Sequence, residues 1–139
     1  MSTIQRRVHD MYQQVINEQQ LDQLPQFFAD HYIDHQPMHD LEPNLSGMQK
    51  GFKKLFQAFK DYHIQIDRII EEAPWIAVSL SITGVHQGEF GGIKPSQRAF
   101  RVRGIDLLKV EDGLITERDG LFDMQSLIFQ LNQQKIAQK

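Results

Sequence analysis

The stretch that decides the fold runs from Arg98 to Asp123 and has the sequence RAFRVRGIDLLKVEDGLITERDGLFD. Apolar and polar residues alternate on both sides of Asp112-Gly113. An Asp-Gly pair between two such runs is the strongest short-range signal for a β-hairpin with a two-residue turn. We therefore expect two antiparallel strands, over about 98–110 and 114–123.

This turn also predicts which residues face one another across the hairpin. With Asp112 and Gly113 at the tip, Asp106 lies directly opposite Asp119, on a face that is otherwise apolar. Opposed side chains have Cβ atoms about 4.5–5.5 Å apart, so burial and mutual repulsion would make two such carboxylates share a proton. A group of this kind can take a proton from an acidic carbon and return one to an oxygen. Asp119 and Asp106 are therefore the predicted catalytic pair.

Two alternatives to this interpretation remain open at the level of sequence. Asp106 or Asp119 could reach water at the rim of the sheet or pair with a basic residue such as Arg118, and a longer turn would move one of them to the other face. Asp123 stands just before the last helix and fits an N-cap, although it could also contact a substrate.

The rest of the chain predicts helices first and strands afterwards, which is typical of an α+β fold. Helical spacing of apolar residues covers 4–16 and 21–28, and Ser46 is the expected N-cap of a third helix reaching Phe59. Residues 31–46 are predicted to be irregular. Strand-like alternation covers about 62–70 and 75–86, a glycine-rich loop follows at 88–95, and a closing helix is expected over about 124–136. No repeat or linker divides residues 1–139, so we expect one domain.

Composition excludes several classes of function. The chain has no cysteine, which excludes thiol catalysis, zinc fingers, iron–sulfur ligation and a disulfide scaffold. Its 15 Lys and Arg against 18 Asp and Glu give a net charge of −3, which argues against a nucleic-acid partner. The first residues lack the apolar core of a signal peptide, and the uncharged run 73–87 is too short to span a membrane. We expect a cytoplasmic protein.

Four further features are candidates for a site. His31, His35 and His39 are spaced by four, but Pro37 breaks the helix that would align them, so no metal site is predicted. His35 could instead donate a hydrogen bond to a substrate carbonyl or enolate, or hold the irregular segment through the backbone. His86 could line a pocket or lie at a strand end in solvent. Phe56 belongs to an aromatic series that is core by default and can also line a cavity.

Small side chains on one strand suggest a contact between subunits. Ser79, Ser81 and Thr83 form an uncharged face that is neither core nor a normal solvated surface. Because small side chains allow a second sheet to approach closely, a homodimer is the simplest expectation.

Several of these segments together resemble one family. Gly84-Val-His-Gln-Gly-Glu-Phe-Gly-Gly-Ile-Lys-Pro-Ser-Gln-Arg, Arg103-Gly-Ile-Asp-Leu-Leu-Lys-Val-Glu-Asp-Gly-Leu-Ile-Thr-Glu-Arg-Asp and Tyr32-Ile-Asp-His-Gln-Pro are similar, in this order along the chain, to motifs of the SnoaL-like polyketide cyclases, also called ester cyclases. The resemblance implies a cone-shaped, curved antiparallel sheet packed on N-terminal helices, as in nuclear-transport-factor-like and cystatin-like folds. It also implies a cofactor-free intramolecular aldol closure, with the family's acid/base Asp at Asp119 and its partner, a His in characterised cyclases, at Asp106. Arg118 and Asp119 stand where many members have His-Trp.

These observations predict a cofactor-independent cyclase or isomerase that acts at a carbon next to the carbonyl of a small, apolar compound. Catalysis is assigned to Asp119, Asp106 and His35. Substrate contacts are assigned to His86, Arg118, Asp123, Tyr32 and Phe56. The alternatives are a non-catalytic small-molecule-binding or sensory module on the same fold, or a dimerisation domain.

Overall fold

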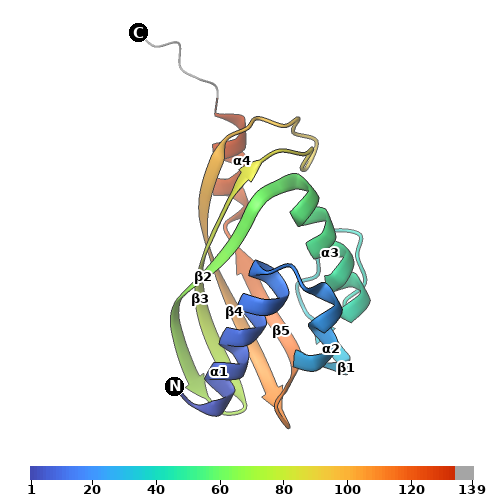
Figure 1. Cartoon of the computed structure of the whole chain (residues 1–139), viewed down its shortest axis with the longest axis vertical. Helices are drawn as coiled ribbons and strands as arrows, with labels where there is room; N and C mark the ends of the chain where they lie inside the picture. The colour runs from blue at the N-terminus through green and yellow to red at the C-terminus, as the bar shows by residue number, and fades with distance from the viewer. Residues whose placement is uncertain (134–139) are drawn as a thin grey trace.

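The computed structural model describes residues 1–133 and shows a curved, unclosed sheet of five strands with helices on one face (Figure 1). The strands are β1 (Phe28–Asp34), β2 (Phe59–Glu72), β3 (Trp75–His86), β4 (Ala99–Glu111) and β5 (Leu114–Phe122), in the spatial order β1-β5-β4-β3-β2. The helical segments are α1 (Thr3–Asp10), a π-helical turn (Met11–Asn17), a short 3₁₀ turn (Leu21–Gln23), α2 (Leu24–Phe27), α3 (Leu45–Ala58) and α4 (Met124–Asn132). The predicted α+β class and curved sheet on N-terminal helices are confirmed.

Alternation along the strands explains which face of the sheet is covered. On β4, even-numbered residues such as Val102 and Leu108 are buried against the helices, and odd-numbered residues such as Arg101 and Ile105 face outward. The apolar stripe of α1 and the π-helical turn, with Val8, packs on the same inner face. Figure 1 shows α1, α2 and α3 on this side of the sheet, with α4 near one end.

One strand was missed by the sequence interpretation. Residues 28–34 form β1, which pairs with β5 in a parallel ladder that places Asp34 beside Arg118. The prediction of an irregular segment is thus wrong over residues 31–34. Asp30 and His31 are exposed at the edge of the sheet, and their polar side chains hid the strand pattern. The sheet is also not antiparallel throughout.

Of the two helix caps predicted from the sequence, one differs from the expectation and one is confirmed. The side chain of Asn44, rather than that of Ser46, accepts the backbone N–H of Gly47 and caps α3. Asp123 does cap α4, accepting the backbone N–H of Ser126 at 2.9 Å. The predicted end of the last helix, residues 134–136, lies outside the described residues. Within residues 1–133, no helix is long and apolar enough to cross a membrane.

Candidate functional site

The β4–β5 hairpin has the predicted turn but not the predicted register. Glu111 faces Leu114, and Val110 faces Ile115, as expected. A β-bulge then inserts Thr116 as an extra residue on β5, so that Lys109 faces Glu117. Every later pair is shifted by one residue.

The shift separates the two predicted catalytic carboxylates. Asp106 is buried on the inner face and lies opposite Gly120, whereas Asp119 lies opposite Leu107 and is exposed on the outer face. The predicted pairing of Asp106 with Asp119 is therefore wrong. A one-residue slip sends each side chain to the other face of a strand, and the bulge produces such a slip.

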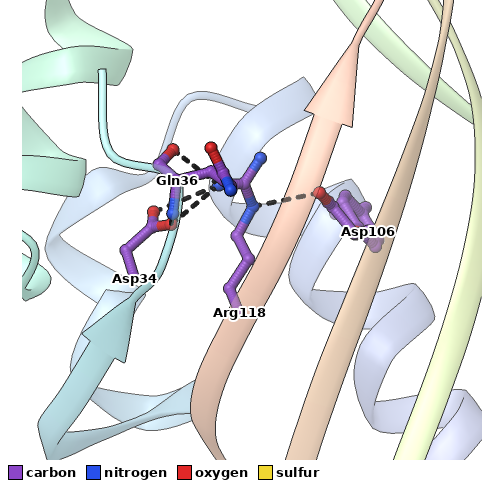
Figure 2. Close-up of polar contacts among 5 residues, drawn as sticks. Asp34, Gln36, Asp106 and Arg118 are labelled. Carbon is purple, nitrogen blue, oxygen red and sulfur yellow. Dashed lines mark hydrogen bonds and ion pairs between the residues drawn. The ribbon is translucent and has the colours of Figure 1, made fainter. Parts of the chain in front are cut away.

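The same shift turns Arg118 inward, into a cluster built by three neighbouring strands (Figure 2). Its Nε donates to Oδ1 of Asp106 at 3.0 Å. Its Nη1 donates to both carboxylate oxygens of Asp34, at 3.0 and 3.1 Å, and contacts the carbonyl oxygen of Gln36 at 3.4 Å. Asp34 was not among the predicted site residues, because the sequence interpretation missed the strand that carries it.

A tyrosine from the π-helical turn completes the cluster. The hydroxyl of Tyr12 donates to Oδ2 of Asp106 at 2.5 Å, so both oxygens of this carboxylate are engaged. Short π-helical segments are rare and are frequent at functional sites. Here the segment brings Tyr12 to the inner face of β4, a contact that helical periodicity alone does not reveal.

Burial and charge together set the protonation of the basic and phenolic groups. Burial by itself lowers the pKa of Arg118, but the carboxylates of Asp106 and Asp34 outweigh it and raise that pKa above its ordinary value. Burial, reinforced by Asp106, raises the pKa of Tyr12 well above 10.0. At neutral pH the guanidinium is therefore charged and the phenol is a donor.

Tyr32 lies beside this cluster with a free hydroxyl. It is 2% exposed, and its Oη has no hydrogen-bond partner among residues 1–133. Burial, followed by the nearby Asp34 carboxylate, raises the pKa of Tyr32. Its position in the site agrees with the predicted substrate contact, which stays a prediction.

The other predicted site residues lie apart from the cluster. His35 is at the surface, where its Nε2 contacts Oε1 of Glu117 at 2.8 Å, so the predicted place of His35 inside a pocket is wrong. His31 and His39 contact the acidic residues beside them in the chain, Asp30 and Asp40. Among residues 1–133, no three metal-ligating side chains converge.

His86 and Phe56 occupy the interior beyond the cluster. His86 is completely buried at the end of β3, and Phe56 packs edge-on against Tyr62 with ring centroids 5.9 Å apart. A small, mostly apolar hollow lies in this region; its lining residues are Leu55, Phe59, Tyr62, Ile82, Phe100, Val102, Phe122 and Leu127. It admits about one water molecule, so a ligand pocket here stays a prediction.

Known proteins share both the fold and part of the sequence. The chain is 22% identical to TsrD from Streptomyces laurentii, with a TM-score of 0.84 over 95% of this chain and 98% of that one. It is 20% identical to a SnoaL-like polyketide cyclase from Agrobacterium tumefaciens, with a TM-score of 0.77 over 95% and 100% of the two chains.

Two sequence comparisons are more specific. A 64-residue segment is 33% identical to nogalonic acid methyl ester cyclase from Streptomyces nogalater, covering 46% of this chain and about half, 48%, of that relative. The family described as SnoaL-like polyketide cyclase matches residues 6–131. This chain therefore belongs to the SnoaL-like polyketide cyclase family.

Proposed function

We propose that this protein is a cyclase or isomerase that performs acid–base chemistry at a carbon next to a carbonyl group, with Asp106 as the general base. The observation that carries the proposal is the position of Asp106. It is the inward-facing carboxylate of the β4–β5 hairpin, held by Tyr12 and Arg118 beside the apolar interior. Membership of a cyclase family supports the reaction class.

Asp106 has spare capacity to accept a proton. A carboxylate offers about four lone-pair directions, and Tyr12 and Arg118 occupy two of them. These contacts fix the carboxylate in place and leave its remaining lone pairs for a proton. Removal of an α proton then leaves the negative charge on the substrate oxygen.

Tyr32 is the proposed donor to that oxygen. Its hydroxyl is buried and unpartnered, and its raised pKa keeps the proton on it at neutral pH. A donor fixed in a site of low polarity stabilises the developing enolate more than the ground-state carbonyl. Arg118 positions the base in this scheme, because it forms ion pairs with both Asp106 and Asp34.

Charge limits the substrate class that we propose. Asp34, Asp106 and Arg118 together carry one net negative charge, so the cluster disfavours a substrate with an ionised carboxylate near the reacting carbon. An ester or a ketone has no such charge. One relative, nogalonic acid methyl ester cyclase, is named for an ester.

The experiment measures exchange of substrate α protons in D₂O by NMR, with nogalonic acid methyl ester as the first compound. We expect Asp106→Asn to slow exchange by about 10²–10⁴-fold, the usual contribution of a positioned base. Asp119→Asn is the matched control, because it makes the same change on the outer face of the same hairpin. Retention of the wild-type exchange rate by Asp106→Asn would show that the base is assigned incorrectly.

A second candidate function is binding without chemistry. It is favoured by the ion pairs around Arg118, which satisfy both carboxylates in the absence of a ligand. A compound that binds to the wild-type protein and shows no α-proton exchange above the buffer rate would support this candidate over the cyclase.

A further inference from the structure

Arg118 has a donor group that its ion pairs with Asp106 and Asp34 do not use. Its Nε donates to Asp106, and its Nη1 donates to Asp34 and contacts the carbonyl oxygen of Gln36. The third nitrogen of the guanidinium, Nη2, donates to no atom of residues 1–133. A guanidinium has five N–H bonds, and two of them are on this nitrogen. Arg118 therefore keeps two donors free.

Nη2 of Arg118 is also reached by solvent. Among residues 1–133, the buried side-chain nitrogen and oxygen atoms without a partner are Oη of Tyr32 and Nε2 of His86. Nη2 has no partner either and is not one of them, so it is not buried. The side chain of Arg118 is 21% exposed, and that of Asp106 is 10% exposed. Both members of this ion pair thus have surface that a molecule in solution can contact.

The free donor lies beside the carboxylate of Asp106. Nη2 and Nε form one edge of the planar guanidinium, with N–H bonds that run nearly parallel, and Nε already contacts Asp106. A Cβ built on Gly120 gives independent evidence, because it would overlap Oδ1 of Asp106 and lie 3.0 Å from Nη2. Nη2 and Oδ1 are therefore close neighbours, and one small group of a substrate can contact both residues.

Removal of an α proton by Asp106 moves a negative charge but keeps it beside the same guanidinium. The bond between hydrogen and the α carbon breaks, and an O–H bond forms on Asp106, which becomes neutral. The electron pair left on carbon is delocalised onto the carbonyl oxygen, which becomes negative. The total charge of Asp34, Asp106, Arg118 and the substrate is −1 before and after this step. A donor directed at that oxygen binds the enolate more strongly than the ketone or ester, which is what catalysis requires.

We propose that Arg118 is a catalytic residue, whose Nη2 donates a hydrogen bond to the substrate carbonyl oxygen while Asp106 removes the α proton. The inference rests on the proposed function for the role of Asp106. It gives Arg118 a second task besides positioning the base, and it adds a charged donor to the neutral hydroxyl of Tyr32. It also specifies that the carbonyl group approaches from the exposed side of Arg118.

An NMR titration of the wild-type protein with ¹⁵N-labelled arginine tests the contact directly. The probes are 2-acetylnaphthalene and 2-ethylnaphthalene, which differ by a ketone oxygen. We expect the ketone to shift the Nη2 signal of Arg118 and to leave the signals of Arg103, which is exposed on the outer face, unchanged. The hydrocarbon should shift neither. An unmoved Nη2 signal with the ketone at its solubility limit would overturn the proposal.

Arg118→Lys keeps a positive charge between Asp106 and Asp34 and removes Nη2. We expect the wild-type protein to prefer the ketone over the hydrocarbon, in Kd from the NMR titrations, by about three- to tenfold more than Arg118→Lys does, the usual range for one hydrogen bond. Arg103→Lys is the matched control; it makes the same change on the outer face and should keep the wild-type preference. An undiminished preference in Arg118→Lys would contradict a donor role for Nη2.

Exchange of substrate α protons tests the catalytic part of the proposal. We expect Arg118→Lys to slow exchange by about 10²–10³-fold, the usual cost of one donor to a developing oxyanion, and therefore by more than it weakens binding of the ketone. Equal changes in exchange and in binding would mean that Nη2 binds the carbonyl without stabilising the enolate, and would overturn the catalytic role. The ketone preference is measured without turnover, so it can hold even if Asp106→Asn shows that Asp106 is not the base.

Discussion

Asp106 and Gly120 face each other across the β4–β5 ladder, and the carboxylate of Asp106 occupies the space that a side chain at position 120 would need. A Cβ built on Gly120 would overlap Oδ1 of Asp106 and lie 3.0 Å from Nη2 of Arg118. Glycine at this position is therefore required by the charged cluster. Its backbone conformation places no such demand, because Gly120 is not among the residues with positive φ.

Gly120→Ala should destabilise the protein by about 1–3 kcal/mol, because the added methyl group must displace the carboxylate or the guanidinium. Urea denaturation measures the loss. The matched control is Asp119→Ala, an exposed neighbour expected to change stability by no more than about 0.5 kcal/mol. In an Asp106→Ala background, Gly120→Ala should cost much less, since its steric partner is gone. If Gly120→Ala lowered stability equally in the wild-type and Asp106→Ala proteins, overlap with the Asp106 carboxylate could not be the cause.

The hairpin shows how far the sequence could predict this site. The alternation of β4 and β5 and the Asp112-Gly113 turn were sufficient to predict both strands and the inward position of Asp106. The bulge at Thr116 was not predictable from alternation, because Ile115 and Thr116 are both buried and a bulge interrupts the period of two.

The strand of Asp34 was hidden for a different physical reason. β1 lies at an edge of the sheet, so its exposed residues are polar and its apolar pattern is short. Its partner is far away in the chain and pairs with it in parallel, without a hairpin turn to mark the register. Arg118 gave no signal either, because only the bulge turns it onto the apolar face, where it meets the two carboxylates.

Arg118→Met should destabilise the protein strongly, by about 3–5 kcal/mol at pH 7, because it leaves Asp34 and Asp106 buried without their cation. Urea denaturation at pH 7 measures the effect. Arg103→Met is the control; Arg103 is 64% exposed on the outer face, and its removal should cost no more than about 1 kcal/mol. Similar losses in the two variants would mean that the buried ion pairs of Arg118 contribute no more to stability than the exposed contacts of Arg103.

The pair formed by His35 and Glu117 should contribute to stability within a defined range of pH. The hydrogen bond to Glu117 raises the pKa of His35, so its contribution is complete below 6.5 and is lost as the pH rises through the folded-state value. The hydrogen bond to His35 lowers the pKa of Glu117, so that contribution is complete above 4.5 and is lost as the pH falls through the folded-state value. The pair is fully formed between these two ordinary values.

His35→Asn should therefore lower the urea midpoint most between pH 4.5 and 6.5, with a difference that shrinks toward pH 9. An NMR titration of the His35 ring gives a second check. Its pKa should fall in Glu117→Gln and stay unchanged in Glu111→Gln, which alters a glutamate that contacts the same Lys109 but not His35. A His35 pKa that is the same in Glu117→Gln would contradict the assigned cause.

The homodimer stays a prediction, and the outer face of the sheet indicates where its two subunits would contact each other. Ser81, expected at the subunit contact, is buried within one chain and forms hydrogen bonds with Asp67 and Arg101. Ile105 lies opposite Ser79 on β3 and opposite Leu121 on β5, and Ile105 and Leu121 are 60% and 67% exposed. Adjacent apolar side chains left in water favour contact with a second copy of the same face.

Sedimentation equilibrium should give twice the mass of one chain for the wild-type protein and the mass of one chain for Leu121→Lys, because a charge in a two-fold contact meets its own copy. Phe129→Lys is the control, since Phe129 is equally exposed, at 66%, but lies on α4 and not on the sheet. Dissociation caused by Phe129→Lys alone would move the contact to α4. A wild-type protein that is monomeric at high concentration would rule out the dimer, and the exposure of Ile105 and Leu121 would then need another explanation.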